Sequence, residues 1–263
     1  MTRVLIAYDG SDPARAAVAA AGALFGGADA IVATVYPPPP SIEAGRLARP
    51  ALPDAMIREG IERMREQAEA KARGIAQEGA QLAADAGLKA TPAIHVGLSA
   101  WRTLREAAAA ADADVLAAGT RGEGPLSRLF LGCTASSLLH HADRPLLLAP
   151  AGEVRTDGPL LAGFDDSDGA RDALRFAAAH VRGRPLIVAH AWRSPVRHTL
   201  RGQLLAGSGV EVLEEYADGI DEVYASEAAA VAEDGAAFAR ELGLDERRLA
   251  LESGEDEWRT LLS

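Results

Sequence analysis

Short apolar runs alternate along this chain with longer stretches whose apolar positions recur at helical spacing. The first apolar run, residues 4–7, is typical of a buried strand, and Asp9-Gly10-Ser11-Asp12-Pro13 follows it as a turn that caps a helix. In the first 150 residues the pattern predicts further strands and helices. The predicted strands are 4–7, 31–35, 93–96, 115–118 and 145–148, and the helices after the first are 53–86, 100–111 and 135–141, with a loop at 121–131.

Strands that alternate with helices favour one architecture. Such segments form a parallel sheet with right-handed crossovers and helices on both faces. We therefore expect an α/β fold, a doubly wound parallel five-stranded sheet. In such sheets ligands bind beyond the carboxyl ends of the strands, where the strand order reverses.

The sequence also repeats itself. VLIAYDGSDPARAAV, from residue 4, matches LLAGFDDSDGARDAL at an offset of 156, and IVATVYP, from residue 31, matches IVAHAWR at the same offset. GLSAWRTL and GEDEWRTL match at an offset of 157. Three blocks in register indicate a duplicated domain. The predicted domains are residues 1–150, which bind nucleotide, and 151–263, a second copy that is incomplete at its C-terminus.

The second copy stops early in the sequence. A counterpart of the Gly119 loop would fall at about residue 276, whereas the sequence ends at Ser263. The second copy is therefore expected to hold strands one to three and no phosphate-binding loop, which limits the chain to one nucleotide. Its first strand would keep an open edge. Either the chain is a fragment of a longer protein, or a partner subunit covers that edge.

Composition and charge narrow the classes of function. A single Cys and a first segment that runs straight into a strand predict a cytoplasmic protein. No run approaches the roughly 20 apolar residues of a membrane span. The net charge is −11, and residues 211–263 hold 16 acidic and 4 basic side chains. Because no basic stripe is present, we expect no nucleic-acid partner.

Glycine spacing marks the candidate chemistry. Gly119 and Gly122 enclose two residues, and Gly122 and Gly132 enclose nine, with a helix starting after the last. Glycines let a backbone approach a phosphate closely, and a helix N-terminus offers free N–H groups and a favourable dipole. Together with the Asp9 turn after the first strand, these segments predict a nucleotide site.

This spacing resembles the nucleotide motif of the universal stress protein family, and the resemblance extends over the whole first repeat. It implies that ATP, with or without Mg, is the ligand, and that the chain forms a homo-oligomer or an internal pseudo-dimer. The resemblance places Ala7, Tyr8 and Asp9 beside adenosine, and Val35 on adenine. It places the remaining residues around the ribose and the phosphates, and these are Ala118, Gly119, Arg121, Gly122, Gly132, Cys133 and Thr134.

Three of these residues have competing interpretations. Cys133 stands where the family has Ser or Thr, and a thiol is a weaker hydrogen-bond donor than a hydroxyl. Asp9 could cap a helix, as Asp165 in the second repeat could, as well as bind a ligand. Arg121 is either a ligand contact or a solvated loop charge.

The sequence contains few motifs that indicate catalysis. The chain has no P-loop, no dinucleotide fingerprint after its first strand and no nucleophile elbow. We therefore predict an ATP-binding protein with a stress-response or signalling role, not an enzyme. The alternatives are a nucleotide-free protein–protein interaction module of the same fold and, more weakly, an enzyme that hydrolyses adenine nucleotides.

Overall fold

The computed structural model describes residues 1–48, 52–120, 132–152, 158–181, 183–194 and 210–252, and in the last range the side chains of 219–245. The chain divides into two compact units, Met1–Thr156 and Asp157–Ser263. Within the described ranges, no helix has the length and apolar character needed to cross a membrane.

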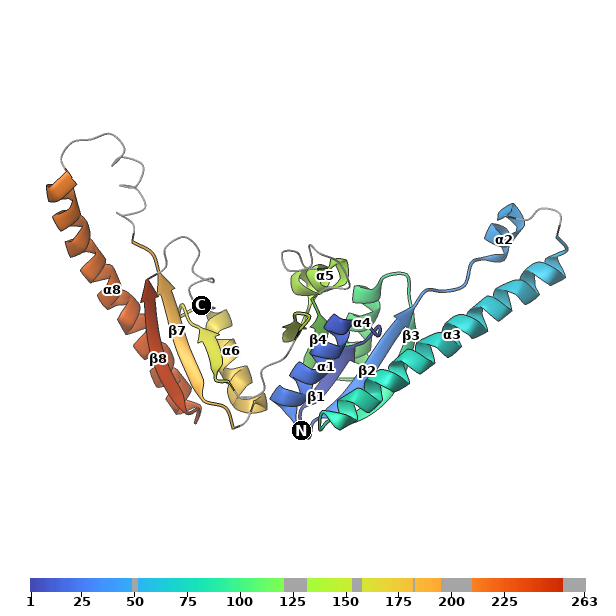
Figure 1. Cartoon of the computed structure of the whole chain (residues 1–263), viewed down its shortest axis with the longest axis horizontal. Helices are drawn as coiled ribbons and strands as arrows, with labels where there is room; N and C mark the ends of the chain where they lie inside the picture. The colour runs from blue at the N-terminus through green and yellow to red at the C-terminus, as the bar shows by residue number, and fades with distance from the viewer. Residues whose placement is uncertain (49–51, 121–131, 153–157, 182, 195–209, 253–263) are drawn as a thin grey trace. The chain divides into compact units, whose positions relative to one another are not determined.

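The first unit is a five-stranded parallel sheet in the order β3-β2-β1-β4-β5, which confirms the predicted fold class. Helices join the strands, as Figure 1 shows. The elements are β1 (Arg3–Ala7), α1 (Asp12–Phe25), β2 (Asp29–Tyr36), α2 (Ile42–Ala48), α3 (Asp54–Asp85), β3 (Lys89–Val96), α4 (Ala100–Ala110), β4 (Val115–Gly119), α5 (Cys133–His141) and β5 (Leu146–Ala149).

The core of this unit lies on both faces of β1. The strand pairs with β2 on one side and β4 on the other, and its Val4, Leu5 and Ile6 are fully buried. Helices α1 and α3 pack against each other on one face of the sheet, and α4 and α5 pack against each other on the other. Leu104 of α4 and Leu138 of α5 join Leu5 in a single apolar cluster. Strand order reverses beside β1, so a ligand site is expected there.

Several predicted bounds differ from the structure by one or two residues, and three differences affect the sheet or the pocket. Strand β3 starts at Lys89 and includes Pro92. It is an edge strand and pairs with β2 on one side only, so no second neighbouring strand needs the N–H that proline lacks. Helix α2 was not predicted. Helix α5 starts at Cys133, two residues before its predicted start. The predicted loop at 121–131 lies outside the described residues.

The second unit holds a three-stranded parallel sheet in the order β6-β7-β8, the arrangement of β1-β2-β3. Phe164, Leu174 and Val188 form its buried core. Its incompleteness as a second copy stays a prediction. The described elements are β6 (Leu160–Gly163), α6 (Asp168–His180), β7 (Leu186–Trp192), α8 (Val210–Glu241) and β8 (Glu246–Glu252).

Candidate functional site

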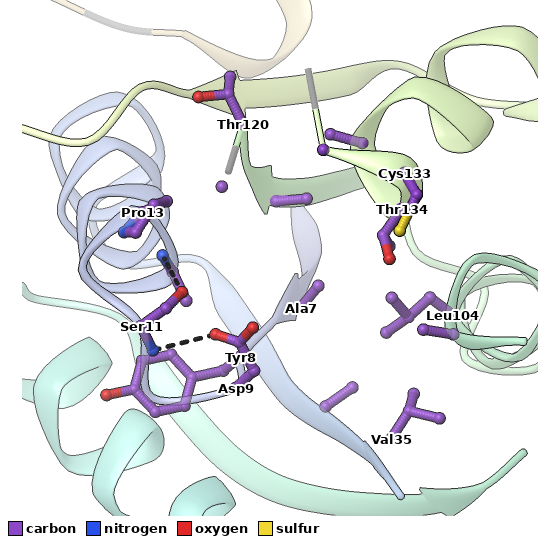
Figure 2. A pocket seen from close by; sticks show the side chains of 17 residues that line it. Ala7, Tyr8, Asp9, Ser11, Pro13, Val35, Leu104, Thr120, Cys133 and Thr134 are labelled. Carbon is purple, nitrogen blue, oxygen red and sulfur yellow. Dashed lines mark hydrogen bonds between the residues drawn. The ribbon is translucent and has the colours of Figure 1, made fainter. Parts of the chain in front are cut away.

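A pocket of about 290 Å³ lies at the carboxyl ends of β1, β2 and β4, beside the N-termini of α1, α4 and α5 (Figure 2). Small-molecule sites usually measure roughly 300–1,000 Å³, so this one lies at the lower end. Its lining is contributed by segments that are far apart in the sequence. These residues are Ala7, Tyr8, Asp9, Ser11, Pro13, Ala14, Ala33, Val35, Ala100, Leu104, Ala118, Gly119, Thr120, Gly132, Cys133, Thr134 and Ala135.

The turn after β1 forms one wall. Oδ1 of Asp9 accepts a hydrogen bond from the Ser11 N–H at 3.0 Å, and Gly10 between them has φ +85°. Ser11 is the N-cap of α1, and its Oγ accepts from the N–H of Ala14 at 3.4 Å. Position 10 favours glycine because other residues rarely adopt a positive φ. The turn thus presents the start of α1 and the Asp9 carboxylate to the pocket.

The start of α5 forms the facing wall. The Thr120 N–H donates to Ala149 O at 2.8 Å, and the Gly132 N–H donates to Thr120 O at 2.7 Å, which fixes the start of α5 beside the end of β4. Gly132 is the N-cap and has no side chain that could accept from the first-turn N–H groups. These N–H groups and the helix dipole therefore favour an anion at Cys133 and Thr134.

The third wall is apolar. Ala33 and Val35 of β2 lie two residues apart and so share one face of the sheet, and Ala100 and Leu104 of α4 lie one helical turn apart. Leu104 is only 3% exposed, and Val35 packs against the same apolar cluster. This wall offers apolar surface and suits an aromatic ring rather than a phosphate.

Tyr8 lines the pocket, but its ring lies on the opposite face of the sheet, against α3. A Cβ added at Gly79 of α3 would lie 2.5 Å from Cδ1 of Tyr8, which shows how closely the ring rests on that helix. The hydroxyl donates to Glu78 Oε1 at 3.0 Å, and Arg15 Nη2 contacts the same oxygen at 2.6 Å. Burial, followed by the hydrogen bond to Glu78, raises the pKa of Tyr8 to about 12.

Gly119 has a role in packing that the glycine spacing did not reveal. A Cβ at this position would lie 2.4 Å from the backbone carbon of Pro13 and 2.6 Å from its Cβ. A side chain here would push the first turn of α1 away from β4. The absence of a side chain is therefore required by helix packing, whether or not a ligand approaches the same backbone.

The electrostatics of the described lining are simple. Asp9 is its only charged side chain, and none of the described lining residues is basic. Among the described residues, no group of three or more His, Cys, Asp or Glu side chains is arranged to hold a metal ion. An anionic ligand would thus depend on backbone N–H groups and on helix dipoles.

The structure brings nine of the eleven predicted site residues to this one pocket, while Arg121 and Gly122 lie outside the described residues. That the nine bind a nucleotide stays a prediction. The pocket also includes residues that sequence reasoning missed. Ala33 could have been found from its period-two relation to Val35, whereas Thr120 is the residue directly after Gly119. Ser11 and Thr120 lie in the two segments that the sequence marked but were given no role, and the missed residues are Pro13, Ala14, Ala33, Ala100, Leu104 and Ala135.

Comparison with known proteins identifies the family. The model of the universal stress protein family matches residues 1–150. This chain belongs to the universal stress protein family. It is 36% identical over 149 residues to the universal stress protein in the QAH/OAS sulfhydrylase 3′ region of Thermus aquaticus, a match that covers 55% of this chain and 96% of that protein. A universal stress protein of Mycolicibacterium smegmatis is 35% identical over 99 residues, which are 36% of this chain and 33% of the relative.

A solved structure extends the likeness in fold to both units. The crystal structure of a universal stress protein from Archaeoglobus fulgidus covers 99% of this chain and 81% of its own, with a TM-score of 0.58 and 19% identity. At that identity the likeness concerns the fold alone. It agrees with the parallel sheets observed in both units.

Proposed function

We propose that the first unit binds an adenine nucleotide, with ATP, alone or with Mg²⁺, as the expected ligand, and that binding serves a stress-response or signalling role in the cytoplasm. One observation carries the proposal: nine residues predicted from sequence, on strands β1, β2 and β4 and at the start of α5, surround one pocket at the point where the strand order reverses. Membership of the universal stress protein family supports it.

The three walls suggest how the nucleotide is oriented. Adenine lies on the apolar wall of Val35 and Leu104, the ribose hydroxyls donate to the Asp9 carboxylate, and the phosphates lie at the N-terminus of α5 beside Thr134 (Figure 2). Asp9 and Thr134 come from opposite walls, so the polar ends of the ligand are held apart. The arrangement keeps the phosphates next to N–H groups and away from the carboxylate.

Binding without turnover is the simpler proposal for this lining. The one carboxylate among the described lining residues, Asp9, already accepts the Ser11 N–H, and no described lining residue is a histidine or a lysine. A general base must lie within hydrogen-bond reach of the proton that it abstracts. The described lining supplies a binding surface for phosphate and offers little to activate water.

A nucleotide-free interaction module is the second candidate. The observation that favours it is the charge of the described lining, which includes a carboxylate and no basic side chain to offset a polyphosphate. A pocket of this kind can also accept a neutral side chain from a protein partner. The two candidates differ in whether the purified protein binds nucleotide at all.

The deciding experiment is calorimetric titration of the full chain with ATP, GTP and cyclic AMP, using two matched variants. Asp9→Ala and Asp165→Ala remove the same turn hydrogen bond, because Oδ1 of each carboxylate accepts a serine N–H at 3.0 and 3.1 Å. Only Asp9 lines the pocket. A lost hydrogen bond to a charged group is worth about 1.5–3 kcal/mol, so Asp9→Ala should weaken ATP binding roughly 10- to 150-fold.

Asp165→Ala should leave ATP affinity unchanged. Equal affinity in Asp9→Ala and the wild type would contradict the role of Asp9, and equal losses in both variants would attribute the effect to the turn. Wild-type protein that binds none of the three nucleotides would support the interaction module instead.

A further inference from the structure

A half-buried histidine lies directly beside the apolar wall of the pocket. His95 of β3 pairs with Val35 of β2, and Val35 lines the pocket. Residues that pair in this way in parallel strands carry their side chains on the same face of the sheet. On that face Val35 packs with Leu104 of α4 (Figure 2), and α4 also packs against β3. The imidazole of His95 therefore belongs to the face on which the pocket opens.

One nitrogen of this imidazole is buried without a partner. Nε2 of His95 has no hydrogen-bond partner among the described residues. In a neutral imidazole that nitrogen can carry a lone pair alone, whereas an imidazolium has an N–H on both nitrogens. Protonation would thus place an unpaired donor and a charge where water does not reach, which is costly. In agreement with this, burial lowers the pKa of His95 below its ordinary value.

The neighbouring elements bring no charge that offsets this cost. On β2 the residues of this face are Ala33 and Val35, and helix α3 packs on the other face of β2 and β3. Both arginines of α4 lie over the Trp101 ring, with Cζ 5.1 and 5.8 Å from its centroid. The charged side chains of α4 are Arg102, Arg105 and Glu106. Within the described part of the chain, burial is the one cause of the lowered pKa of His95.

The end of β3 is joined mechanically to the pocket wall. The Gly97 N–H donates to Tyr36 O at 2.9 Å. A Cβ added at Gly97 would lie 2.0 Å from Oγ1 of Thr103, so the first turn of α4 rests directly on this glycine. Ala100 in the same turn lines the pocket. Because His95 lies only two residues before Gly97, a displacement of its ring moves both Val35 and the start of α4.

We propose that protonation of His95 closes this pocket to its ligand, so that the site binds nucleotide at neutral pH and releases it in mild acid. This regulation rests on the nucleotide binding proposed for the first unit. Strand β3 is at the edge of the five-stranded sheet, so the charged ring turns outward to water without crossing another strand of that sheet. A base on Val35 favours the neutral, inward ring. Ligand and proton therefore oppose each other at one site.

Calorimetric titration with ATP at pH 8 and pH 5.5 tests this coupling in the wild type and in His95→Gln. The phosphates of ATP titrate in the same range, so the two proteins are compared at each pH. The wild type should lose about three- to tenfold more affinity than His95→Gln between the two pH values. His180→Gln is the matched control, because it removes a histidine of the second unit that stacks on Phe176. It should keep the wild-type pH profile.

A proton NMR titration of wild-type His95, assigned through the backbone, tests the same coupling without a substitution. By reciprocity, saturating ATP should lower the pKa of His95 further, because a base over Val35 deepens the burial of the ring. Equal losses of affinity in the wild type and His95→Gln, or a pKa of His95 that ATP leaves unchanged, would overturn the regulation alone. Absence of ATP binding at pH 8 would overturn the proposed function, and the regulation with it.

Discussion

The two units form the same turn at the end of their first strand, and only one of them builds the described pocket on it. Asp9 accepts the Ser11 N–H at 3.0 Å, and Asp165 accepts the Ser167 N–H at 3.1 Å. In each unit the serine then caps the following helix. The helix cap is therefore the serine in both units, and the interpretation that Asp9 and Asp165 are themselves the caps is wrong. Each aspartate instead accepts the N–H of the capping serine and so supports the turn.

The difference lies in what stands beside the first strand. Strand β1 is flanked by β2 and β4, and Leu5 is fully buried, whereas β6 pairs only with β7 among the described residues and Leu161 is 41% exposed. In the first unit, β4 and α5 supply the wall that faces the turn. A turn with an aspartate borders a pocket when a second strand end and a helix N-terminus lie opposite to it.

On the face that carries α3 and α8, by contrast, one contact is nearly the same in the two units. A Cβ at Gly79 would lie 2.5 Å from Cδ1 of Tyr8, and one at Gly235 would lie 2.6 Å from Cδ1 of Phe164. Each glycine lets the aromatic ring of the residue after the first strand rest directly on the long helix. This contact is common to both units and can be broken in either one.

The largest expected effect follows from that contact. Gly79→Ala and Gly235→Ala should each destabilise the protein by about 1–3 kcal/mol through overpacking, measured by urea denaturation. Gly74→Ala on α3 is the control, since its Cβ would meet nothing within 4 Å. It should stabilise the helix by about 0.5–1 kcal/mol. If Gly79→Ala lowered the free energy of unfolding and Gly235→Ala left it unchanged, the contacts of the two long helices would not be equivalent.

Alkaline pH should distinguish the two aromatic rings. Burial and Glu78 raise the pKa of Tyr8 to about 12, so its neutral form is favoured in the folded protein. The resulting stability is complete below the ordinary tyrosine pKa near 10 and is lost as pH rises towards 12, on the order of 2–3 kcal/mol at most. Phe164 has no hydroxyl, so the second unit lacks this dependence.

Tyr8→Phe should therefore flatten the loss of stability between pH 10 and 12, as followed by denaturant melts at several pH values. Absorbance at 295 nm would report the tyrosinate directly. If Tyr8→Phe lost stability between pH 10 and 12 as the wild type does, another titrating group would cause this loss.

The smallest effect is expected at acid pH in the second unit. Hydrogen bonds from the side chain and backbone of Ser167 hold the pKa of Asp165 below its ordinary value, and His190 acts in the same direction. The associated stability is present above the ordinary pKa near 3.9 and disappears as pH falls through the lower folded value. Asp165 is exposed, so the effect should be less than about 1 kcal/mol.

Asp165→Asn and Ser167→Ala should both reduce the pH dependence of stability below pH 4, measured by thermal melts at low ionic strength. An acid profile that neither substitution alters would show that solvent screens the turn completely.

Sequence patterns were reliable where a single local rule applied. The helix start at Ser11, the buried run in β1 and the long helix α3 all follow from spacing, capping and apolar periodicity. Sequence patterns were wrong where the position of an element in the sheet decided its bounds. Strand β3 was predicted to start at residue 93 but starts at Lys89, and its position at the sheet edge is what allows it to include Pro92.

The site shows the same division. Glycine spacing led to Gly119 and Gly132, and strand ends led to Asp9 and Val35, because those signals are local in the chain. Leu104 carries no local signal for a ligand, since an apolar residue on a helix is ordinarily read as core. It lines the pocket because α4 packs across β2 and β4.

The sequence by itself determined that this protein alternates strands and helices, repeats its first segment and places a turn and a glycine motif after two strands. Those features depend on backbone preferences and on apolar period, which are written in neighbouring residues. Tertiary structure alone decided that Gly119 must be small to admit Pro13 and that the end of β4 stands beside the turn. These are contacts between residues more than 100 positions apart, so no local pattern can record them.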